Sequence, residues 1–200
     1  MAKRGTDDGG ASPPLSRQAK RLAESGLDRR WHLAQTPDEI AVTEFEYALI
    51  RAGEGFSHWQ AECLAAVTGL AMSGADNAIL HVIRMKDRPK GVKEIGRLMN
   101  RDDIPNIQYS IRKLLKAGLI EKLGESSRRK GVAYQATKKG VKVTEDYAKL
   151  RANLLIDFFR DMGGVDDNLE TATRVLELVA GIYEQTGRIA ATYRKDRRDD

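Results

Sequence analysis

One stretch of the chain, residues 91–137, carries three periodicities in an order that strongly limits its fold. Apolar residues recur at helical spacing in residues 92–99 and again in residues 106–117, which predicts two short amphipathic helices with a turn between them. Two apolar runs follow, in residues 119–123 and 132–137, and these predict strands joined by a loop. The stretch therefore predicts a compact unit of two helices and a hairpin.

The ends of the second helix are marked by the residue types that favour them. Asp102 or Asp103 can cap its first turn by accepting a backbone N–H, and Pro105 suits a position where no N–H is needed. Gly118 is expected to end the helix, because glycine enters the left-handed conformation without a steric cost.

The face of this helix opposite its apolar stripe is expected to be free. At about 100° per residue, that face carries amide, aromatic and cationic groups, which suit base edges and phosphates in a major groove. Its residues are Pro105, Asn106, Gln108, Tyr109, Arg112, Lys113 and Lys116. Such a helix can also be merely a solubilising surface, and only its combination with a basic hairpin loop favours DNA.

The hairpin loop supplies that second basic element. It holds Arg128, Arg129 and Lys130, whose charges suit a contact with phosphates or with the minor groove. A solvated turn would have the same composition. Helix and loop in this order make the DNA interpretation the stronger one.

These residues resemble the MarR family of winged-helix transcription regulators, over roughly residues 39–193. The family's second helix ends in a segment like LxxxGLI, which reads LLKAGLIEK here. The family's wing often reads D-x-R, followed by alternating apolar residues and L-T. Aligned on Thr137, that pattern places Arg128 at the aspartate, Lys130 at the arginine and Ala136 at the leucine. The resemblance implies that the wing contacts DNA, with Arg128 or Arg129 as a substitute for the leading arginine.

The distribution of charge agrees with a polyanionic partner. The net charge is +5, but residues 84–142 hold 17 Lys and Arg against 6 Asp and Glu, and the rest of the chain is acidic. A basic region that coincides with the helix-turn-helix and wing suits DNA. A membrane surface is the weaker alternative, because the basic region is not one amphipathic helix.

The sequence also limits the compartment. Cys63 is the one cysteine, so no internal disulfide can form. No run of about 18 apolar residues suggests a membrane span, and no apolar segment follows Lys3 and Arg4 to make a signal peptide. We therefore expect a cytoplasmic protein.

The N-terminal half is predicted to be a tail followed by helices. Residues 1–14 are expected to be disordered, and residues 15–32 to form either an extra helix or a tail that touches DNA. Thr36 is expected to cap a long helix that runs to about Met72. Its buried side is predicted to consist of Ile40, Phe45, Leu49, Phe56, Trp59, Cys63, Val67 and Leu70.

Three further helices are expected around the basic region. Ser73 can cap a helix over residues 75–84, and residues 141–162 form a long apolar helix. Asp166 or Asp167 is expected to cap a last helix that runs to about Tyr193. These two C-terminal helices carry more apolar surface than a small winged helix can cover, so we expect a homodimer, as the resemblance also implies. An intramolecular helical hairpin is the alternative.

The predicted fold is mainly α with a small β wing, a winged helix-turn-helix with long N- and C-terminal dimerisation helices. Its expected parts are a disordered tail (1–14), N-terminal helices on the dimerisation and effector side (15–72), the winged helix-turn-helix (73–140) and C-terminal dimerisation helices (141–200).

No chemistry of an enzyme is indicated. The three histidines, His32, His58 and His81, lack the spacing of a metal site, and no phosphate loop or catalytic set occurs, so we expect neither metal nor cofactor. Cys63 lies on an apolar stripe without a neighbouring cation, which favours a buried core thiol over a redox sensor.

We therefore expect a transcription regulator, most simply a repressor, that binds a pseudo-palindromic operator on double-stranded DNA. The resemblance implies an aromatic or carboxylate small-molecule effector between the dimerisation helices and the winged helix. Its candidate contacts are Arg51, His58, Trp59, His81 and Arg84. For Arg51 the sequence favours a surface ion pair with Glu46, Glu54 or another nearby acid over a ligand contact. The alternative function is a winged-helix protein-interaction module without a specific DNA site.

Overall fold

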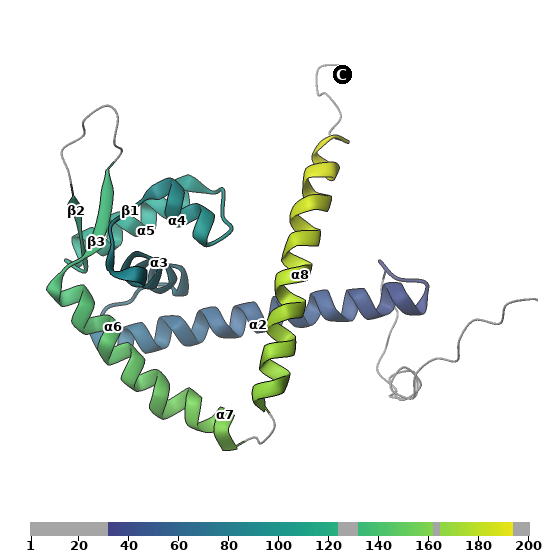
Figure 1. The fold of residues 1–200 in the computed structure, drawn as a ribbon, viewed down its shortest axis with the longest axis horizontal. Helices are drawn as coiled ribbons and strands as arrows, with labels where there is room; N and C mark the ends of the chain where they lie inside the picture. The colour runs from purple at the N-terminus through teal and green to yellow at the C-terminus, as the bar shows by residue number, and fades with distance from the viewer. Residues whose placement is uncertain (1–31, 124–131, 162–164, 194–200) are drawn as a thin grey trace, which may run out of the picture. The chain divides into compact units, whose positions relative to one another are not determined.

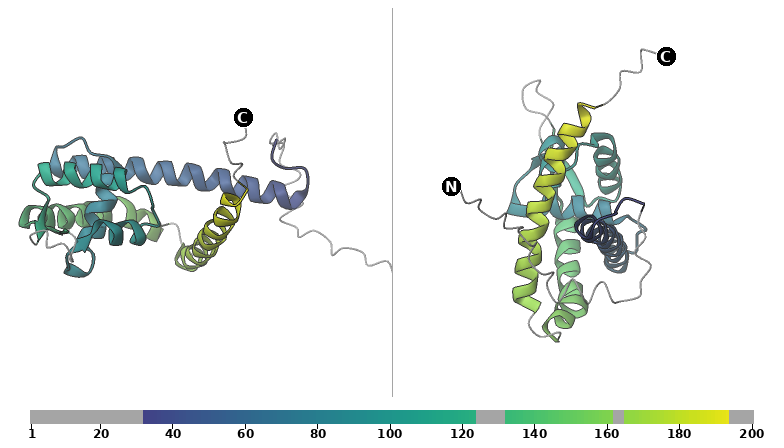
Figure 2. Two further views of the ribbon diagram at one scale, coloured as in Figure 1. Left: turned by 90° about the horizontal axis from the view of Figure 1, so that it is seen from above. Right: turned by 90° about the vertical axis from the view of Figure 1, so that its right-hand side faces the viewer.

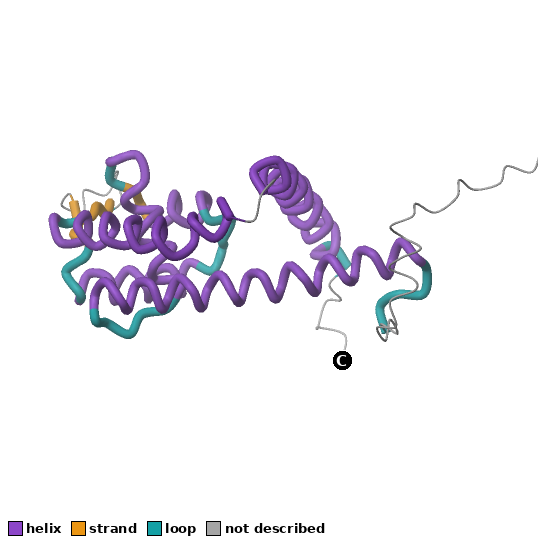
Figure 3. The backbone as a smooth tube through the Cα atoms, turned by 90° about the horizontal axis from the view of Figure 1, so that it is seen from below, coloured by secondary structure: helices purple, strands orange, loops and turns teal. Residues whose placement is uncertain are grey.

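The computed structural model describes residues 32–123, 132–161 and 165–193. Within these ranges most of the backbone is helical and the strands form one small sheet (Figure 3), so the predicted fold class is confirmed. The chain divides into two compact units, residues 1–53 and 54–200. The expected tail, and all of residues 15–32 except His32, lie outside the described residues. No helix in the described ranges has the length and apolar character needed to cross a membrane.

Helix α2 (Pro37–Thr68) starts where the sequence predicts (Figure 1). The Thr36 hydroxyl accepts the N–H of Glu39 at 3.3 Å, and the Glu39 carboxylate accepts the N–H of Thr36 at 2.9 Å. This reciprocal pair satisfies N–H groups that the helix leaves free. The helix ends before the predicted Met72, because Gly69 adopts a φ of 68°, a left-handed conformation that interrupts helical bonding.

The predicted buried side of α2 is largely uncovered in the single chain. Of those residues only Cys63 is buried, and burial raises the pKa of its thiol, as expected for a core cysteine. Phe56 is 57% exposed, and Leu49 and Leu70 are also exposed. The prediction is therefore wrong for Leu49, Phe56 and Leu70, because an apolar stripe indicates which side favours burial without showing what covers it.

Helix α3 (Gly74–Arg84) begins at the predicted cap. The Ser73 hydroxyl accepts the N–H of Asp76 at 3.2 Å, and the Asp76 carboxylate accepts the N–H of Ser73 at 2.8 Å. Gly74 lies so close to Ser57 that a Cβ would be 2.4 Å from its carbonyl oxygen, so only glycine fits here.

Helices α4 (Val92–Leu98) and α5 (Ile104–Lys116) match the two predicted short helices, and Gly118 ends α5 with a φ of 68°. The predicted aspartate cap is wrong. Asp103 occupies the cap position, but its carboxylate pairs with Arg101 and accepts the Asn106 amide at 3.1 Å instead of a helix N–H. The bond from Arg101, with help from Asn106, lowers the pKa of Asp103 to about 2.

The sheet contains strands β1 (Lys90–Gly91), β2 (Ile120–Leu123) and β3 (Ala133–Ala136), antiparallel in the order β1-β3-β2. Strands β2 and β3 lie within the predicted runs. Strand β1 is not predicted, because two residues cannot display an alternating pattern. Its Lys90 pairs with Tyr134, which joins the segment before α4 to the hairpin.

The predicted helix over residues 141–162 is present but starts earlier. It consists of α6 (Lys138–Arg151), a π-helical turn η2 (Ala152–Ile156) and α7 (Asp157–Asp161), which follow without a break. Thr137 moves the start forward, because its hydroxyl accepts the N–H of Gly140 at 3.1 Å.

Helix α8 (Val165–Ala191) has already begun at Val165, so the prediction that Asp166 or Asp167 caps it is wrong. Residues 162–164, between the two predicted helices, lie outside the described residues. Several large apolar side chains of α8 are exposed: Leu169, Val175, Leu176, Leu178, Ile182, Tyr183 and Ile189. Their spacing places them on one broad side of the helix, which the single chain leaves open to water.

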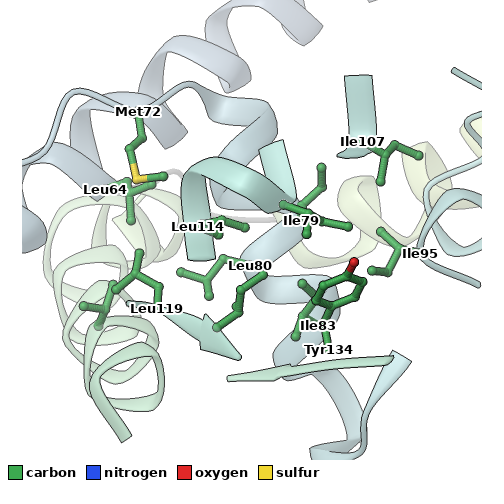
Figure 4. Close-up of a cluster of buried hydrophobic side chains, with 13 residues drawn as sticks. Leu64, Met72, Ile79, Leu80, Ile83, Ile95, Ile107, Leu114, Leu119 and Tyr134 are labelled. Atoms are coloured by element: carbon green, nitrogen blue, oxygen red, sulfur yellow. The ribbon is translucent and has the colours of Figure 1, made fainter. Parts of the chain in front are cut away.

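The core of the second unit lies where α3 meets its neighbours. Helix α3 contacts α4, α5, α6 and β3, and Figure 2 shows the short helices of residues 74–116 beside the sheet in both views. Figure 4 shows the side chains that converge there, among them Ile79 and Leu80 of α3, Leu114 of α5 and Tyr134 of β3. This packing fixes the buried side of α5 and so determines which of its residues face outward.

Candidate nucleic-acid interface

The outward side of α5 carries the residues expected to read DNA. Ile107, Ser110, Ile111 and Leu114 are buried on the inner side. The exposed residues are Pro105, Asn106, Gln108, Tyr109, Arg112 and Lys116. This arrangement presents two amides near the N-terminus of the helix and cations along its length. It is suited to a groove, where amides can meet base edges and cations can meet phosphates.

Tyr109 occupies the middle of this surface. Its ring is 59% exposed, with the Arg112 guanidinium 5.9 Å and the Lys113 ammonium 5.8 Å from the ring centroid. Both distances fall within the range of a cation–π contact. The ring is therefore held between two positive groups and stays available to an outside partner.

Lys113 differs from the other predicted contacts, because it is already occupied. Its side chain is 32% exposed, and its ammonium forms an ion pair with Asp76 of α3, whose side chain is 1% exposed. The sequence does not reveal this pair, since the two residues are 37 positions apart and no local pattern connects them. Lys113 thus lies between the exposed surface and the interior.

The wing residues Arg128, Arg129 and Lys130 lie outside the described residues. The strands that lead to them are described, and Leu123 of β2 pairs with Ala133 of β3 at the end of the ladder. The Gln135 amide also donates to the Glu121 carboxylate across these strands at 2.7 Å. The base of the hairpin is therefore a regular antiparallel pair.

Of the effector candidates in the second unit, only Trp59 and His81 share a contact residue. Trp59 and His81 both contact Tyr147 of α6, with ring centroids 5.7 Å and 4.5 Å away. Arg84 instead pairs with Asp87, His58 is exposed, and the Arg51 guanidinium lies 5.8 Å from the Tyr47 ring centroid. Tyr147 was not among the candidates, because one aromatic residue on a helical stripe does not stand out from core residues.

The aromatic cluster of Trp59, His81 and Tyr147 contains a buried polar atom that lacks a partner. The Nε2 atom of His81 makes no hydrogen bond, whereas a side-chain hydrogen bond links the neighbouring Asn77 to Tyr147. Such an atom is costly to bury, so a polar ligand or water has a reason to bind it. Among the described residues, no group of three His, Cys, Asp or Glu side chains could hold a metal ion.

The burial of His81 leads to a prediction about pH. Burial lowers the pKa of its imidazole below the ordinary 6.5, so the unfolded chain binds the proton more readily than the folded one. Stability should therefore fall as the pH drops below about 6.5 and level off below the folded-state pKa. In His81→Phe this loss should be smaller, as measured by the melting temperature at a series of pH values. His58→Gln is the control, and identical pH profiles for wild type and His81→Phe would contradict the prediction.

Comparison with known proteins gives one family match. Residues 72–140 match the family described as "Winged helix DNA-binding domain", a range that contains α3, α4, α5 and the hairpin. A search of curated proteins by sequence finds no match.

Several solved structures share the fold. A MarR-family transcriptional regulator from Rhodococcus sp. RHA1 has a TM-score of 0.54 and 18% identity, over 70% of this chain and 94% of that one. The transcriptional repressor CouR, solved with a 23-mer DNA duplex, has a TM-score of 0.54 and 21% identity, over 67% and 91% of the two chains. CouR from Rhodococcus jostii RHA1, solved with p-coumaroyl-CoA, has a TM-score of 0.53 and 16% identity, over 68% and 91%.

Proposed function

Since the chain carries a winged helix DNA-binding domain on the fold of MarR-family regulators, we propose that it is a sequence-specific transcription regulator in the cytoplasm. It acts as a homodimer on a pseudo-palindromic operator and represses transcription there. The observation that carries this proposal is the exposed polar and cationic side of α5, which lies opposite a fully buried apolar stripe. The proposal involves no catalytic activity.

Asn106 and Gln108 are the best placed to contact bases, because the first turns of such a helix enter the groove most deeply. Arg112 can bind a guanine through two hydrogen bonds, which provides about 1–3 kcal/mol of discrimination, or it can hold a phosphate. Lys116 and the wing residues Arg128, Arg129 and Lys130 bind phosphates and contribute affinity that depends on salt.

The proposal also includes a small aromatic or carboxylate effector that relieves repression. Trp59, His81 and Tyr147 are its aromatic contacts, and the unpartnered His81 Nε2 offers it a hydrogen bond. The cluster joins α2, α3 and α6, and α3 also contacts α5. A ligand at this cluster would therefore act on the helix that supports the DNA-facing surface.

The test begins with DNA fragments selected by the protein from a randomised library. Gln108→Ala and Arg112→Ala should each lose preference at one or two symmetric base positions and leave the fold intact, as measured on single-base operator variants at fixed salt. Arg51→Ala also removes a positive charge, but from the acidic part of α2, and it should leave binding unchanged.

The outcomes separate the alternatives. Uniform weakening across all operator variants would make Gln108 and Arg112 phosphate contacts. In that case the slope of log affinity against log salt should fall by about 1 per lost contact in each subunit. Arg128→Ala in the wing is expected to lower the slope by the same amount. Unchanged binding in both α5 variants would contradict the proposed interface and favour the protein-interaction module.

A further inference from the structure

The ion pair between Lys113 and Asp76 joins the DNA-facing helix to the interior. The Asp76 carboxylate takes part in two structures at once, because it accepts the Ser73 N–H at the start of α3 and the Lys113 ammonium from α5. Its side chain is 1% exposed, whereas that of Lys113 is 32% exposed. A single buried carboxylate therefore holds the first turn of α3 and the last turn of α5 together.

Lys113 has a strong reason to stay with Asp76. A buried carboxylate without a counter-charge is costly, because no water replaces the lost cation. Burial by itself would raise the pKa of Asp76, yet the bonds from Lys113, Ser73 and Ser110 outweigh it and lower the pKa. A phosphate contact for Lys113 would form in water and would leave this carboxylate unpaired. Movement of the Lys113 ammonium to DNA is therefore unfavourable, because it would leave the buried Asp76 carboxylate without a counter-charge.

The same ammonium also lies beside the Tyr109 ring on the outer surface. Tyr109 is three-fifths exposed and, under the function proposed above, faces the DNA. The contacts therefore run from the buried Asp76 through Lys113 to an exposed aromatic residue. Lys116, one helical turn further on, is exposed and serves as the comparison.

We propose that Lys113 is a positioning residue of the DNA-binding surface and not a phosphate contact. Its charge neutralises Asp76, fixes α5 against α3, and holds the Tyr109 ring in the orientation that meets DNA. The sequence places Lys113 among the direct DNA contacts, and the ion pair supports this different role for it. The DNA half of this inference rests on the proposed function, whereas the ion pair can be tested without DNA.

The experiment uses the full chain with Lys113→Gln, Asp76→Asn, their double variant, and Lys116→Gln as the matched control. The probe is a duplex of about 30 base pairs selected by the wild-type protein, long enough for two half-sites one turn apart. Melting temperature reports on the ion pair, and the slope of log affinity against log salt reports on phosphate contacts.

Lys116→Gln should reduce the salt slope by about 1 per subunit and leave the melting temperature unchanged. Lys113→Gln should lower the melting temperature and weaken binding by the same factor at every salt concentration, without a change in slope. Asp76→Asn should also lower the melting temperature, but with a slope steeper by up to about 1 per subunit, because the freed ammonium can now reach a phosphate. The melting temperature of the double variant should fall by less than the sum of the decreases in the two single variants.

A reduced salt slope with an unchanged melting temperature in Lys113→Gln would overturn the inference. Additive losses of melting temperature in the double variant would overturn it independently, even if the protein bound no DNA. If wild type bound no duplex while the losses were non-additive, the proposed function and the DNA role of Lys113 would fail, and only the structural ion pair would stand.

Discussion

Leu178→Asp is expected to convert a dimer into a folded monomer. Leu178 is 65% exposed on α8 and belongs to the apolar side of this helix, which also includes Val175 and Ile182. In the single chain an aspartate at this position stays in water and disturbs no packing. In a dimer that covers this side, the same aspartate would be buried without a partner, which costs several kcal/mol. Light scattering at micromolar concentration should show half the wild-type mass, with an unchanged helical circular dichroism spectrum.

Thr173→Asp is the matched control for this prediction. It adds the same charge to α8 at an exposed position away from the apolar side, and it should remain dimeric. A wild-type protein that is monomeric at full helicity would contradict the dimer itself. A Leu178→Asp variant that keeps the dimer mass would show that a different surface joins the two copies.

Lys90→Met is expected to destabilise the second unit by about 1–3 kcal/mol, the cost of one buried acceptor that loses its donor, because only the bond to Ile83 among its three carbonyl bonds is buried. Lys90 is 1% exposed, and its ammonium donates to the carbonyl oxygens of Ile83 and Arg88 at 3.1 Å each, and to that of Met85. Burial lowers the pKa of this ammonium, but the carbonyl oxygens keep it bonded. Methionine retains most of the aliphatic stem and removes only the donor.

Urea unfolding should show this loss of stability as a lower urea concentration at the midpoint of the transition. The control is Lys93→Met, which removes an exposed cation three residues away and should leave the midpoint nearly unchanged. Equal midpoints for the two variants would mean that water satisfies the three carbonyl groups and that Lys90 is dispensable.

The sequence by itself determined the features that depend on neighbouring residues. The helical stripes of α4 and α5, the reciprocal cap of Thr36 and Glu39, and the glycine end of α5 at Gly118 are all local, because each is set by residues within about one helical turn. The outward residues of α5 also followed from its periodicity. Local hydrogen bonding and side-chain spacing are enough to predict such features.

Only the tertiary structure decided what depends on residues far apart in the chain. Lys113 meets Asp76 across 37 positions, and this contact moves a predicted DNA contact partly into the interior. Lys90 is buried against carbonyl oxygens at the end of α3, although lysine is usually a surface residue. Strand β1 exists only because β3 lies beside it. In each case the free energy comes from packing and desolvation between separate elements. The periodicity of the sequence does not indicate which elements will pack against each other.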